Sequence, residues 1–210
     1  MKNIYSNIFK FNKNSLSKCV KYLKKNEVVA LPTETVYGLG GNAYSRSTVL
    51  KIYKIKKRPK SNPLIIHYSN YKNAMKDVEI NKNFIKLYKR FSPGPITFIL
   101  KKRKNSLIST LATAKLNTVA IRFPSDIKIR KILKKIDFPL AMPSANISSK
   151  ISPVDARDVF EEFGKKIKII IDGGRSKIGV ESTVLDLTEG FNILRPGAIS
   201  AKQINKIIKK

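Results

Sequence analysis

Two short segments of this chain gather hydroxyl and amide side chains beyond what core packing requires. The first runs from Leu31 to Ala43 (LPTETVYGLGGNA) and the second from Pro143 to Pro153 (PSANISSKISP). Each follows a short apolar run, so we expect each to be a loop at the end of a strand. Small hydroxyl and amide groups in such loops suit hydrogen bonding to a ligand. Two such loops on one small domain predict a built binding site.

Three basic side chains stand where they could hold an anion. Lys56 and Arg58 end an expected helix just before Pro59, where the helix dipole is the ordinary reason for cations. A lysine and the fork of an arginine can also clamp a polyphosphate, and the amide of Asn62 could orient it. Arg122 ends an otherwise apolar strand, where a charge is costly unless it meets an anion such as a substrate carboxylate. An internal salt bridge is the competing explanation for Arg122, and the count of 14 acidic residues disfavours it.

Single residues elsewhere leave more than one interpretation open. His67 is the one histidine, and no second histidine or carboxylate cluster lies near it in sequence, so a metal site is not expected. A structural role and contact with a ligand both stay open for it. Arg195 precedes a Pro-Gly turn, either as a phosphate or ribose ligand or as a solvated residue. Cys19 fits a buried position in a helix, and a lone cysteine excludes an intramolecular disulfide.

Familiar catalytic motifs are absent from the sequence. It contains no G-x-x-x-x-G-K-[ST] loop, no G-x-G-x-x-G fingerprint and no G-x-S-x-G elbow. Acidic pairs suited to glycoside hydrolysis and runs of aromatic residues suited to RNA stacking are missing as well. A nucleotide would therefore have to be held in some other way.

The net charge of +29 points to a polyanionic partner, either RNA or a phosphorylated substrate. The 34 lysines far outnumber the 9 arginines, a mixture typical of an AT-rich genome, whereas specific phosphate and base recognition favours arginine. Most of the excess charge is therefore assigned to composition. No run of about 18 apolar residues is present, so we expect no membrane span and a cytoplasmic protein.

The elements that must position these residues interleave along the chain. Apolar periodicity predicts helices over residues 15–26, 45–57, 81–91, 125–136, 155–163 and 201–208, and strands over 28–31, 36–39, 64–68, 96–100, 118–123, 140–142, 167–171, 183–187 and 191–194. Asn14 or Ser15 could cap the first helix, Ser45 the second, and Gly164 is a natural end for the fifth. Because strands and helices do not alternate strictly, the sequence predicts an α/β fold with an open, twisted, mixed sheet and outer helices. Residues 1–210 are expected to form one domain.

Seven short motifs follow one another along the chain: PTETVYGLG, K-x-R-P followed by NPL, SPGPIT, VAIRFP, PSANISSKISP, GVESTVLD and ILRPGA. Each motif is weak, but the ordered set is specific. From about Val28 to Gly197 the chain resembles the YrdC-like family of threonylcarbamoyl-AMP synthases. The resemblance implies a sheet with barrel-like curvature and a large basic cavity. It also implies a nucleotidyltransferase that joins L-threonine, bicarbonate and ATP, releases pyrophosphate, and forms L-threonylcarbamoyl-AMP for threonylcarbamoyladenosine in tRNA.

Position by position, the resemblance implies two sets of site residues. The L-threonine set is Thr35, His67, Arg122, Met142 (through its backbone) and Ser182. The ATP set is Lys56, Arg58, Asn62, Thr118, Ser144, Ser152 and Arg195, with Asn146 as a neighbour. Lys56 and Arg58 are the implied catalytic residues, because they would stabilise charge that grows on the phosphoryl oxygens. Arg122 is expected to grip the threonine carboxylate bidentately. Mg²⁺ is the implied cofactor, carried with ATP and without a dedicated protein metal site.

Other functions of this fold stay open from the sequence. A basic cavity could bind tRNA or double-stranded RNA without catalysis, although phosphate binding does not need the Thr/Ser/Asn segments. Related sequences act as carbamoyl-transfer domains in hydrogenase maturation, within longer, cysteine-rich chains, and a divergent branch shares the fold without a settled activity. The intact K-x-R and S-x-N motifs favour the synthase. Proteins that transfer the threonylcarbamoyl group to tRNA are implied partners. Some family members carry a second, C-terminal domain, so this chain is a single-domain type or a portion of a longer one.

Overall fold

A single mixed sheet forms the centre of the molecule. The computed structural model describes residues 5–208, and within them ten strands occur: β1 (Ile8–Lys10), β2 (Val29–Leu31), β3 (Gly38–Asn42), β4 (Ile66–His67), β5 (Ile96–Lys101), β6 (Thr118–Arg122), β7 (Leu140–Ala141), β8 (Ile170–Asp172), β9 (Thr183–Asp186) and β10 (Asn192–Arg195). Their order across the sheet is β1-β8-β2-β3-β7-β4-β6-β5-β9-β10. The pairs β1–β8, β2–β8, β4–β6 and β5–β9 are parallel and the other neighbours are antiparallel. The predicted open, mixed sheet is confirmed.

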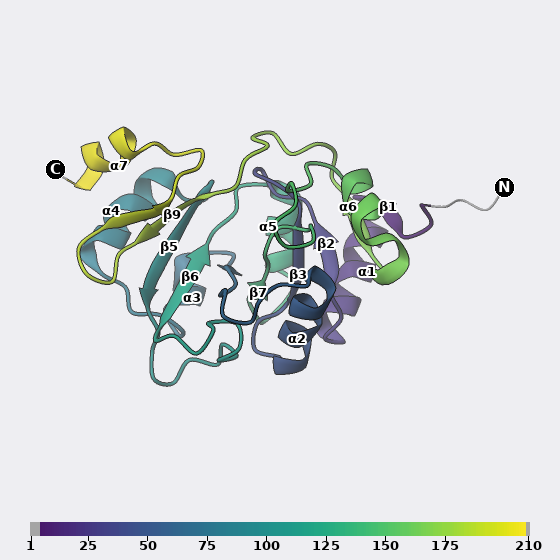
Figure 1. The fold of residues 1–210 in the computed structure, drawn as a ribbon, viewed down its shortest axis with the longest axis horizontal. Helices are drawn as coiled ribbons and strands as arrows, with labels where there is room; N and C mark the ends of the chain where they lie inside the picture. The colour runs from purple at the N-terminus through teal and green to yellow at the C-terminus, as the bar shows by residue number, and fades with distance from the viewer. Residues whose placement is uncertain (1–4, 209–210) are drawn as a thin grey trace.

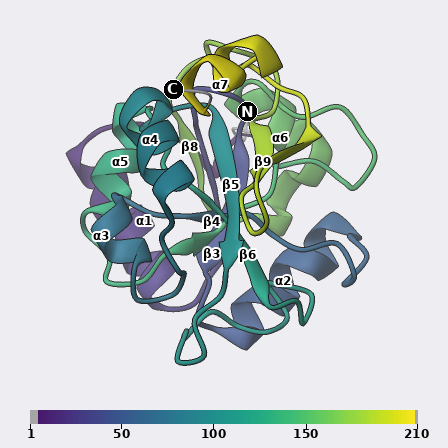
Figure 2. The same ribbon diagram turned by 90° about the vertical axis from the view of Figure 1, so that its left-hand side faces the viewer.

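Helices cover the sheet from outside, as predicted. In the described part of the chain they are α1 (Lys13–Lys24), α2 (Arg46–Lys56), α3 (Tyr71–Ala74), α4 (Lys82–Phe91), α5 (Ile127–Leu133), α6 (Ala156–Phe163), the 3₁₀ helix η1 (Gly164–Lys166) and α7 (Ala201–Ile208). Figure 1 shows the strands in the middle, with α4 and α7 at one end of the long axis and α1 and α6 at the other. In Figure 2, α1, α3, α4 and α5 lie on one side of the sheet and α2 and α6 on the other.

The ends of several helices follow from their capping residues. Ser45 caps α2 as predicted, since its hydroxyl accepts a hydrogen bond from the Thr48 amide at 3.3 Å. Gly164 ends α6 as predicted, with φ of 52° in the left-handed region that glycine tolerates. The prediction that Asn14 or Ser15 caps α1 is wrong. Asn12 is the cap. Its Oδ1 accepts from the Ser15 amide at the third helical position, and the Ser15 hydroxyl accepts from the Asn12 amide, which completes a capping box.

Several strand boundaries differ from the predictions. The strand expected over 36–39 lies at Gly38–Asn42, because three glycines and an asparagine pair there with β2 and β7. The strand expected over 64–68 shortens to Ile66–His67. β1 and the four-residue α3 were not predicted. Strand β1 is specified by parallel pairing with β8, some 160 residues away, and not by a local pattern.

The apolar core lies on both faces of the sheet. Ala30 of β2 and Ile170 of β8 belong to the larger cluster, and their strand neighbours Leu31 and Ile171 belong to the smaller one. This alternation is the period of two that a sheet buried on both faces requires. Cys19 is fully buried in the smaller cluster, as predicted, and burial raises the pKa of its thiol to about 12. Among the helices of residues 5–208, none has the length and hydropathy to cross a bilayer.

Candidate active site

An open hollow lies where the two polar segments meet the ends of β4, β6, β9 and β10. Its free space, counted with its open mouth, is about 480 Å³. The lining residues are Thr33, Val36, Tyr37, Gly38, Arg58, Ile65, His67, Arg122, Met142, Pro143, Ser144, Glu181, Ser182 and Arg195. Seven of these are predicted site residues: Arg58, His67, Arg122, Met142, Ser144, Ser182 and Arg195. Members of the threonine set and of the ATP set therefore share one hollow.

Backbone hydrogen bonds join the two polar segments directly. Gly38 and Ser144 form an isolated antiparallel bridge. The amide of Ala145 donates to the carbonyl of Tyr37 at 2.8 Å, and the amide of Tyr37 donates to the carbonyl of Pro153 at 2.8 Å. Segments more than 100 residues apart in sequence thus form one wall of the hollow. Gly38 has to be small here, because a Cβ on it would lie 2.6 Å from the side chain of Met142.

Arg122 is held by a buried ion pair. Its Nη2 donates to Glu34 Oε1 at 2.8 Å and to Thr35 Oγ1 at 2.9 Å, and both charged side chains are less than one-tenth exposed. The internal salt bridge that the low acid count disfavoured therefore exists, because Glu34 lies in the first polar segment beside the end of β6. The Nε of Arg122 is buried and has no protein partner. With Nη2 occupied, Nε and Nη1 remain for a ligand, so the expected bidentate grip through adjacent donors would require Glu34 to move.

Glu34 was missed as a site residue in the sequence, although the PTETV motif contains it. Its second carboxylate oxygen accepts hydrogen bonds from the amides of Ser125 at 3.1 Å and Asp126 at 3.3 Å. One carboxylate therefore fixes the arginine and the start of the segment that leads into α5. Removing one partner of such a buried pair typically costs about 3–5 kcal/mol, because the other charge is left uncompensated. The Arg122–Glu34 pair is a permanent part of the fold.

His67 lies beside Arg122 in the register of the parallel strands β4 and β6. It is buried, and its Nδ1 is 3.3 Å from the carbonyl oxygen of Ile65. Burial, and then the positive charge of Arg122, hold the pKa of His67 well below 6.5. The imidazole is therefore neutral at pH 7 and adds no charge to the hollow.

Lys56 lies behind the wall of the hollow and is almost completely buried. Its Nζ donates to the carbonyl oxygens of Ser144 at 2.6 Å and Asn146 at 2.5 Å, and lies 3.3 Å from Asn146 Oδ1. Burial, and next the charge of Arg58, lower the pKa of Lys56 to about 8. All three ammonium donors are thus directed at the second polar segment. Lys56 holds that segment in place, and its predicted contact with phosphate stays a prediction.

Arg58 reaches the hollow in an orientation that Asn62 sets. Its Nη2 donates to Asn62 Oδ1 at 2.5 Å and to the Pro63 carbonyl at 3.0 Å, and its Nε donates to the Asn62 carbonyl at 3.1 Å. Asn62 itself is exposed and does not line the hollow. The amide expected to orient a ligand therefore orients the arginine.

Glu181 is a second carboxylate that the sequence analysis did not assign. It forms a close ion pair with Arg195 Nη1, and its Oε1 accepts a hydrogen bond from Ser152 Oγ at 2.9 Å. Ser144 lies near enough to the same carboxylate to lower its pKa. Burial raises the pKa of Glu181, but the charge of Arg195, the two hydroxyls and Lys56 outweigh burial and hold the pKa below its usual value. Glu181 is charged at pH 7.

Several predicted residues stand outside the lining. Thr35 is buried behind the lining, where its hydroxyl accepts a hydrogen bond from Arg122. Asn146 accepts one from Lys56, and Ser152 donates one to Glu181. Thr118 starts β6 and pairs with Lys101, four residues and therefore about 13 Å from Arg122. Its contact with ATP stays a prediction that this geometry does not support.

The charge of the hollow is less positive than its arginines suggest. Of the three arginines that line it, Arg122 is paired with Glu34 and Arg195 with Glu181. The expected large basic cavity therefore stays a prediction. Within residues 5–208, no three histidine, cysteine or acidic side chains come together as a metal-binding group.

Comparisons with known proteins point to one family. The Sua5_yciO_yrdC family model, described as "Telomere recombination", matches residues 21–197. The threonylcarbamoyl-AMP synthase of Pyrococcus abyssi is 44% identical over 189 residues, which cover 89% of this chain and 55% of that protein. The threonylcarbamoyl-AMP synthase of Bacillus subtilis is 42% identical over 200 residues, or 94% of this chain and 57% of that protein.

One solved structure has the same fold as this chain. The crystal structure of P. abyssi Sua5 complexed with L-threonine aligns with a TM-score of 0.90 at 40% identity. The alignment covers 96% of this chain and 60% of that one. The chain thus spans little more than half the length of these relatives.

Proposed function

Because the chain belongs to the Sua5/YciO/YrdC family, we propose that it is a threonylcarbamoyl-AMP synthase. It would join L-threonine, bicarbonate and ATP into L-threonylcarbamoyl-AMP with release of pyrophosphate, as a nucleotidyltransferase of the cytoplasm. The observation that carries the proposal is the single hollow that holds Arg122, His67 and Ser182 together with Arg58, Ser144 and Arg195. The names of the relatives support the enzyme over the RNA-binding alternative.

The residues of the hollow support a mechanism based on positioning. The carboxylate of L-threonine would bind the Nη1 donor of Arg122, which Glu34 leaves free, between Ser182 and the neutral imidazole of His67. The threonine amine would attack bicarbonate to give a carbamate with loss of water. The carbamate oxygen would then attack the α-phosphorus of ATP, and pyrophosphate would leave. Holding the reactants together can supply several kcal/mol of the acceleration, so no protein nucleophile is needed.

Charge that grows on the phosphates during this step needs cations nearby. Arg58 lines the hollow with a guanidinium held in place by Asn62, and Arg195 lines it from the end of β10. Both would stabilise the α-phosphoryl oxygens and the leaving pyrophosphate electrostatically. Lys56 would contribute its charge from behind the wall while it holds Ser144 and Asn146 in place.

Mg²⁺ would enter with ATP and offset part of the phosphate charge. Mg²⁺ commonly takes one or two carboxylates together with phosphate oxygens and waters. Of the residues described as lining the hollow, Glu181 is the one carboxylate, so this donor set fits a metal held mainly by the nucleotide. Proteins that transfer the threonylcarbamoyl group to tRNA would consume the product.

The experiment that tests this function measures pyrophosphate release from ATP, with L-threonine and bicarbonate each present or omitted. We expect release that requires both. Arg58→Ala is expected to abolish release and leave the fold intact. Arg46→Ala, which changes an exposed arginine at the start of α2, the helix that precedes Arg58, is the matched control and should keep pyrophosphate release. ATP that stays intact in every mixture would overturn the proposal.

A further inference from the structure

Three residues predicted to hold ATP have one protein carboxylate as a common neighbour, and Arg195 also donates from Nη2 to the Ser182 carbonyl at 2.9 Å. Arg195 Nη1 pairs with Glu181 Oε2, Ser152 Oγ donates to Glu181 Oε1 at 2.9 Å, and Ser144 lies near enough to lower the pKa of the same carboxylate. Lys56 and Arg58 lie close enough to interact with this carboxylate through their charges. The donors expected to surround a phosphate thus surround Glu181.

A carboxylate and a phosphate share the properties that such donors recognise. Both are anions with several oxygen acceptors, and both take a guanidinium and short hydroxyls as partners. In the protein without nucleotide, Glu181 therefore takes the place that a phosphate would occupy beside Arg195, Ser144 and Ser152. ATP cannot place a phosphate on Arg195, Ser144 and Ser152 while the carboxylate stays between them.

The two Arg–Glu pairs of the hollow differ in how easily they can be exchanged. The side chains of Arg195 and Glu181 are 37% and 33% exposed, whereas those of Arg122 and Glu34 are 5% and 7% exposed. Water can solvate both members of the exposed pair as they separate, and a pair of this kind contributes little to stability. The multiply charged triphosphate can replace Glu181 there, while Glu34 stays on Arg122.

A displaced Glu181 would still stand beside the phosphates. Two anions side by side are unfavourable unless a cation lies between them. The metal ion that accompanies ATP is such a cation, and a single carboxylate beside phosphate oxygens suits Mg²⁺. Glu181 lies two residues before β9, which holds the backbone near it, so a rotation of the side chain suffices for the exchange.

We propose that Glu181 is an internal substitute for a phosphate group of ATP, which the nucleotide displaces from Arg195, Ser144 and Ser152, and that the released carboxylate then contacts the Mg²⁺ of the nucleotide. The proposal rests on the proposed function, since it takes ATP as the ligand of this hollow. Glu181 thus has two sets of partners: protein donors when no nucleotide is bound, and Mg²⁺ when ATP is bound.

Isothermal titration calorimetry with ATP tests both parts. Titrations in EDTA and in excess MgCl₂ compare the wild-type protein with Glu181→Gln. Without Mg²⁺ the variant is expected to bind ATP about tenfold tighter, equivalent to about 1.4 kcal/mol, because glutamine neither competes as an anion nor repels the phosphates. With Mg²⁺ this advantage should disappear, because the wild-type protein then gains a metal contact that glutamine lacks.

Glu27→Gln is the matched control, because Glu27 pairs with Lys51 on the surface and does not line the hollow. It should follow the wild-type protein in both titrations, and thermal melting would verify that each variant folds. Equal or weaker ATP binding by Glu181→Gln in EDTA would overturn the substitute role. An advantage of the same size with Mg²⁺ would overturn the metal contact. A wild-type protein that binds no ATP in either buffer would instead overturn the proposed function.

Discussion

Two arginines of the hollow show how burial decides the role of an ion pair. Arg122 and Glu34 are buried together, so separating them would leave a charge without solvent or partner. Arg195 and Glu181 are each about one-third exposed, and water can replace either partner. The same pair of residue types is therefore permanent in one place and exchangeable in the other. For Arg122, the ligand has to use the donors that Glu34 leaves free.

Substitution of Arg122 should therefore affect stability and substrate use separately. Arg122→Ala is expected to lower the free energy of unfolding by about 3–5 kcal/mol, because Glu34 is left buried and unpaired. It should also raise the threonine concentration required for turnover sharply. The measurements are urea unfolding and pyrophosphate release as a function of threonine concentration.

A double variant separates these two effects. Arg122→Met with Glu34→Gln removes both charges, so stability should largely recover, while the threonine requirement should stay high. Recovery of the normal threonine dependence in the double variant would contradict a role of Arg122 in binding the substrate carboxylate.

The buried ammonium of Lys56 predicts a dependence of stability on pH. The pKa of Lys56 is about 8 in the folded protein, against 10.5 as its ordinary value. Below pH 8 the group is protonated in both states, and the cost of burying its charge is fully present. Between pH 8 and 10.5 the folded state loses the proton first, so the unfolded state binds more protons and this cost is progressively relieved.

Comparison with Lys56→Met isolates this contribution from the other lysines. The free energy of unfolding of the wild-type protein, relative to that of the variant, should rise by on the order of 3 kcal/mol between pH 8 and 10.5. Chemical denaturation of both proteins at several pH values measures it. A difference that stays constant over this interval would show that Lys56 keeps its proton in the folded protein.

At the scale of elements, the hollow depends on close approach between segments that are distant in sequence. Gly197 follows β10 and packs on the backbone directly before β9. A Cβ on Gly197 would lie 2.4 Å from the amide nitrogen of Thr183 and 2.6 Å from the carbonyl oxygen of Glu181. Backbone atoms cannot move aside as a flexible side chain can. The turn after Arg195 therefore has to contain glycine for the end of β10 to reach the hollow.

Gly197→Ala should consequently weaken ATP binding as well as stability. We expect a loss of about 1–3 kcal/mol in unfolding free energy and a severalfold higher Kd for ATP, because Arg195 moves away from its partners. Thermal melting and calorimetric titration measure the two effects. Gly190→Ala is the control, since Gly190 has a φ of 76° but open space around it. Gly190→Ala should lose stability and keep its affinity for ATP. A loss of ATP affinity as large as that of Gly197→Ala would contradict the role given to Gly197.

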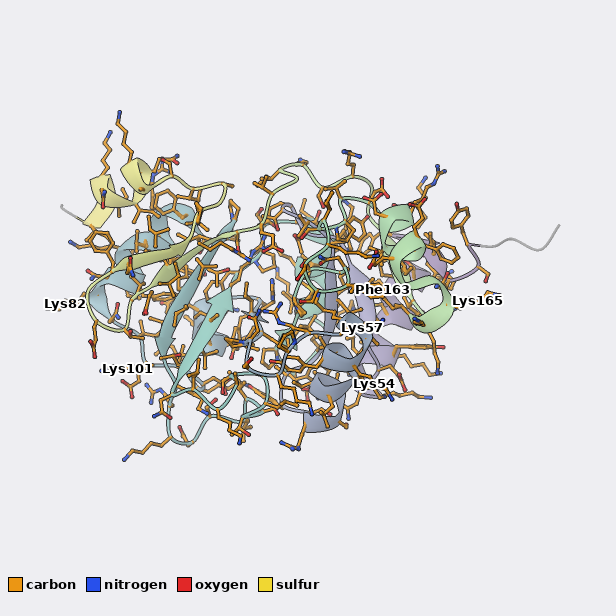
Figure 3. The ribbon with its side chains drawn as sticks, viewed as in Figure 1. Lys54, Lys57, Lys82, Lys101, Phe163 and Lys165 are labelled. Carbon is orange, nitrogen blue, oxygen red and sulfur yellow. The ribbon has the colours of Figure 1, made fainter. Side chains whose placement is uncertain are left out.

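Exposed lysines lie at both ends and in the middle of the molecule. Lys82, Lys54 and Lys165 come from α4, α2 and η1, and Figure 3 shows them at the left, lower middle and right of the molecule. Such dispersion agrees with a charge that arises from composition, and it differs from the single basic stripe of many nucleic-acid readers. Attraction to RNA is then expected to be non-specific.

Binding of RNA should accordingly depend steeply on salt and little on sequence. The affinity for tRNA should fall strongly between 50 and 200 mM salt, because each neutralised phosphate releases counterions. An unrelated RNA of equal length should bind equally well in the same titration. Fluorescence anisotropy measures both, and a marked preference for tRNA at 200 mM salt would contradict this expectation.

The sequence by itself determined the class of the fold and most of the chemistry offered to a ligand. Apolar periodicity and capping residues such as Ser45 and Gly164 act within a few residues, so they predicted the helices that Figures 1 and 2 show around the sheet. The ordered motifs pointed to the hydroxyls, amides and cations of the two polar segments. These signals are local, because each depends on the identity and spacing of neighbouring residues.

The tertiary structure alone decided which of these groups satisfy one another. Arg122 meets Glu34 across 88 positions of sequence, and Arg195 meets Glu181 only because β9 and β10 pair antiparallel. Strand β1 likewise exists through its partner β8. No spacing rule predicts such pairs, since they depend on the path of the chain and on burial. The two glutamates were missed for this reason, and they set which donors of the hollow remain free for a ligand.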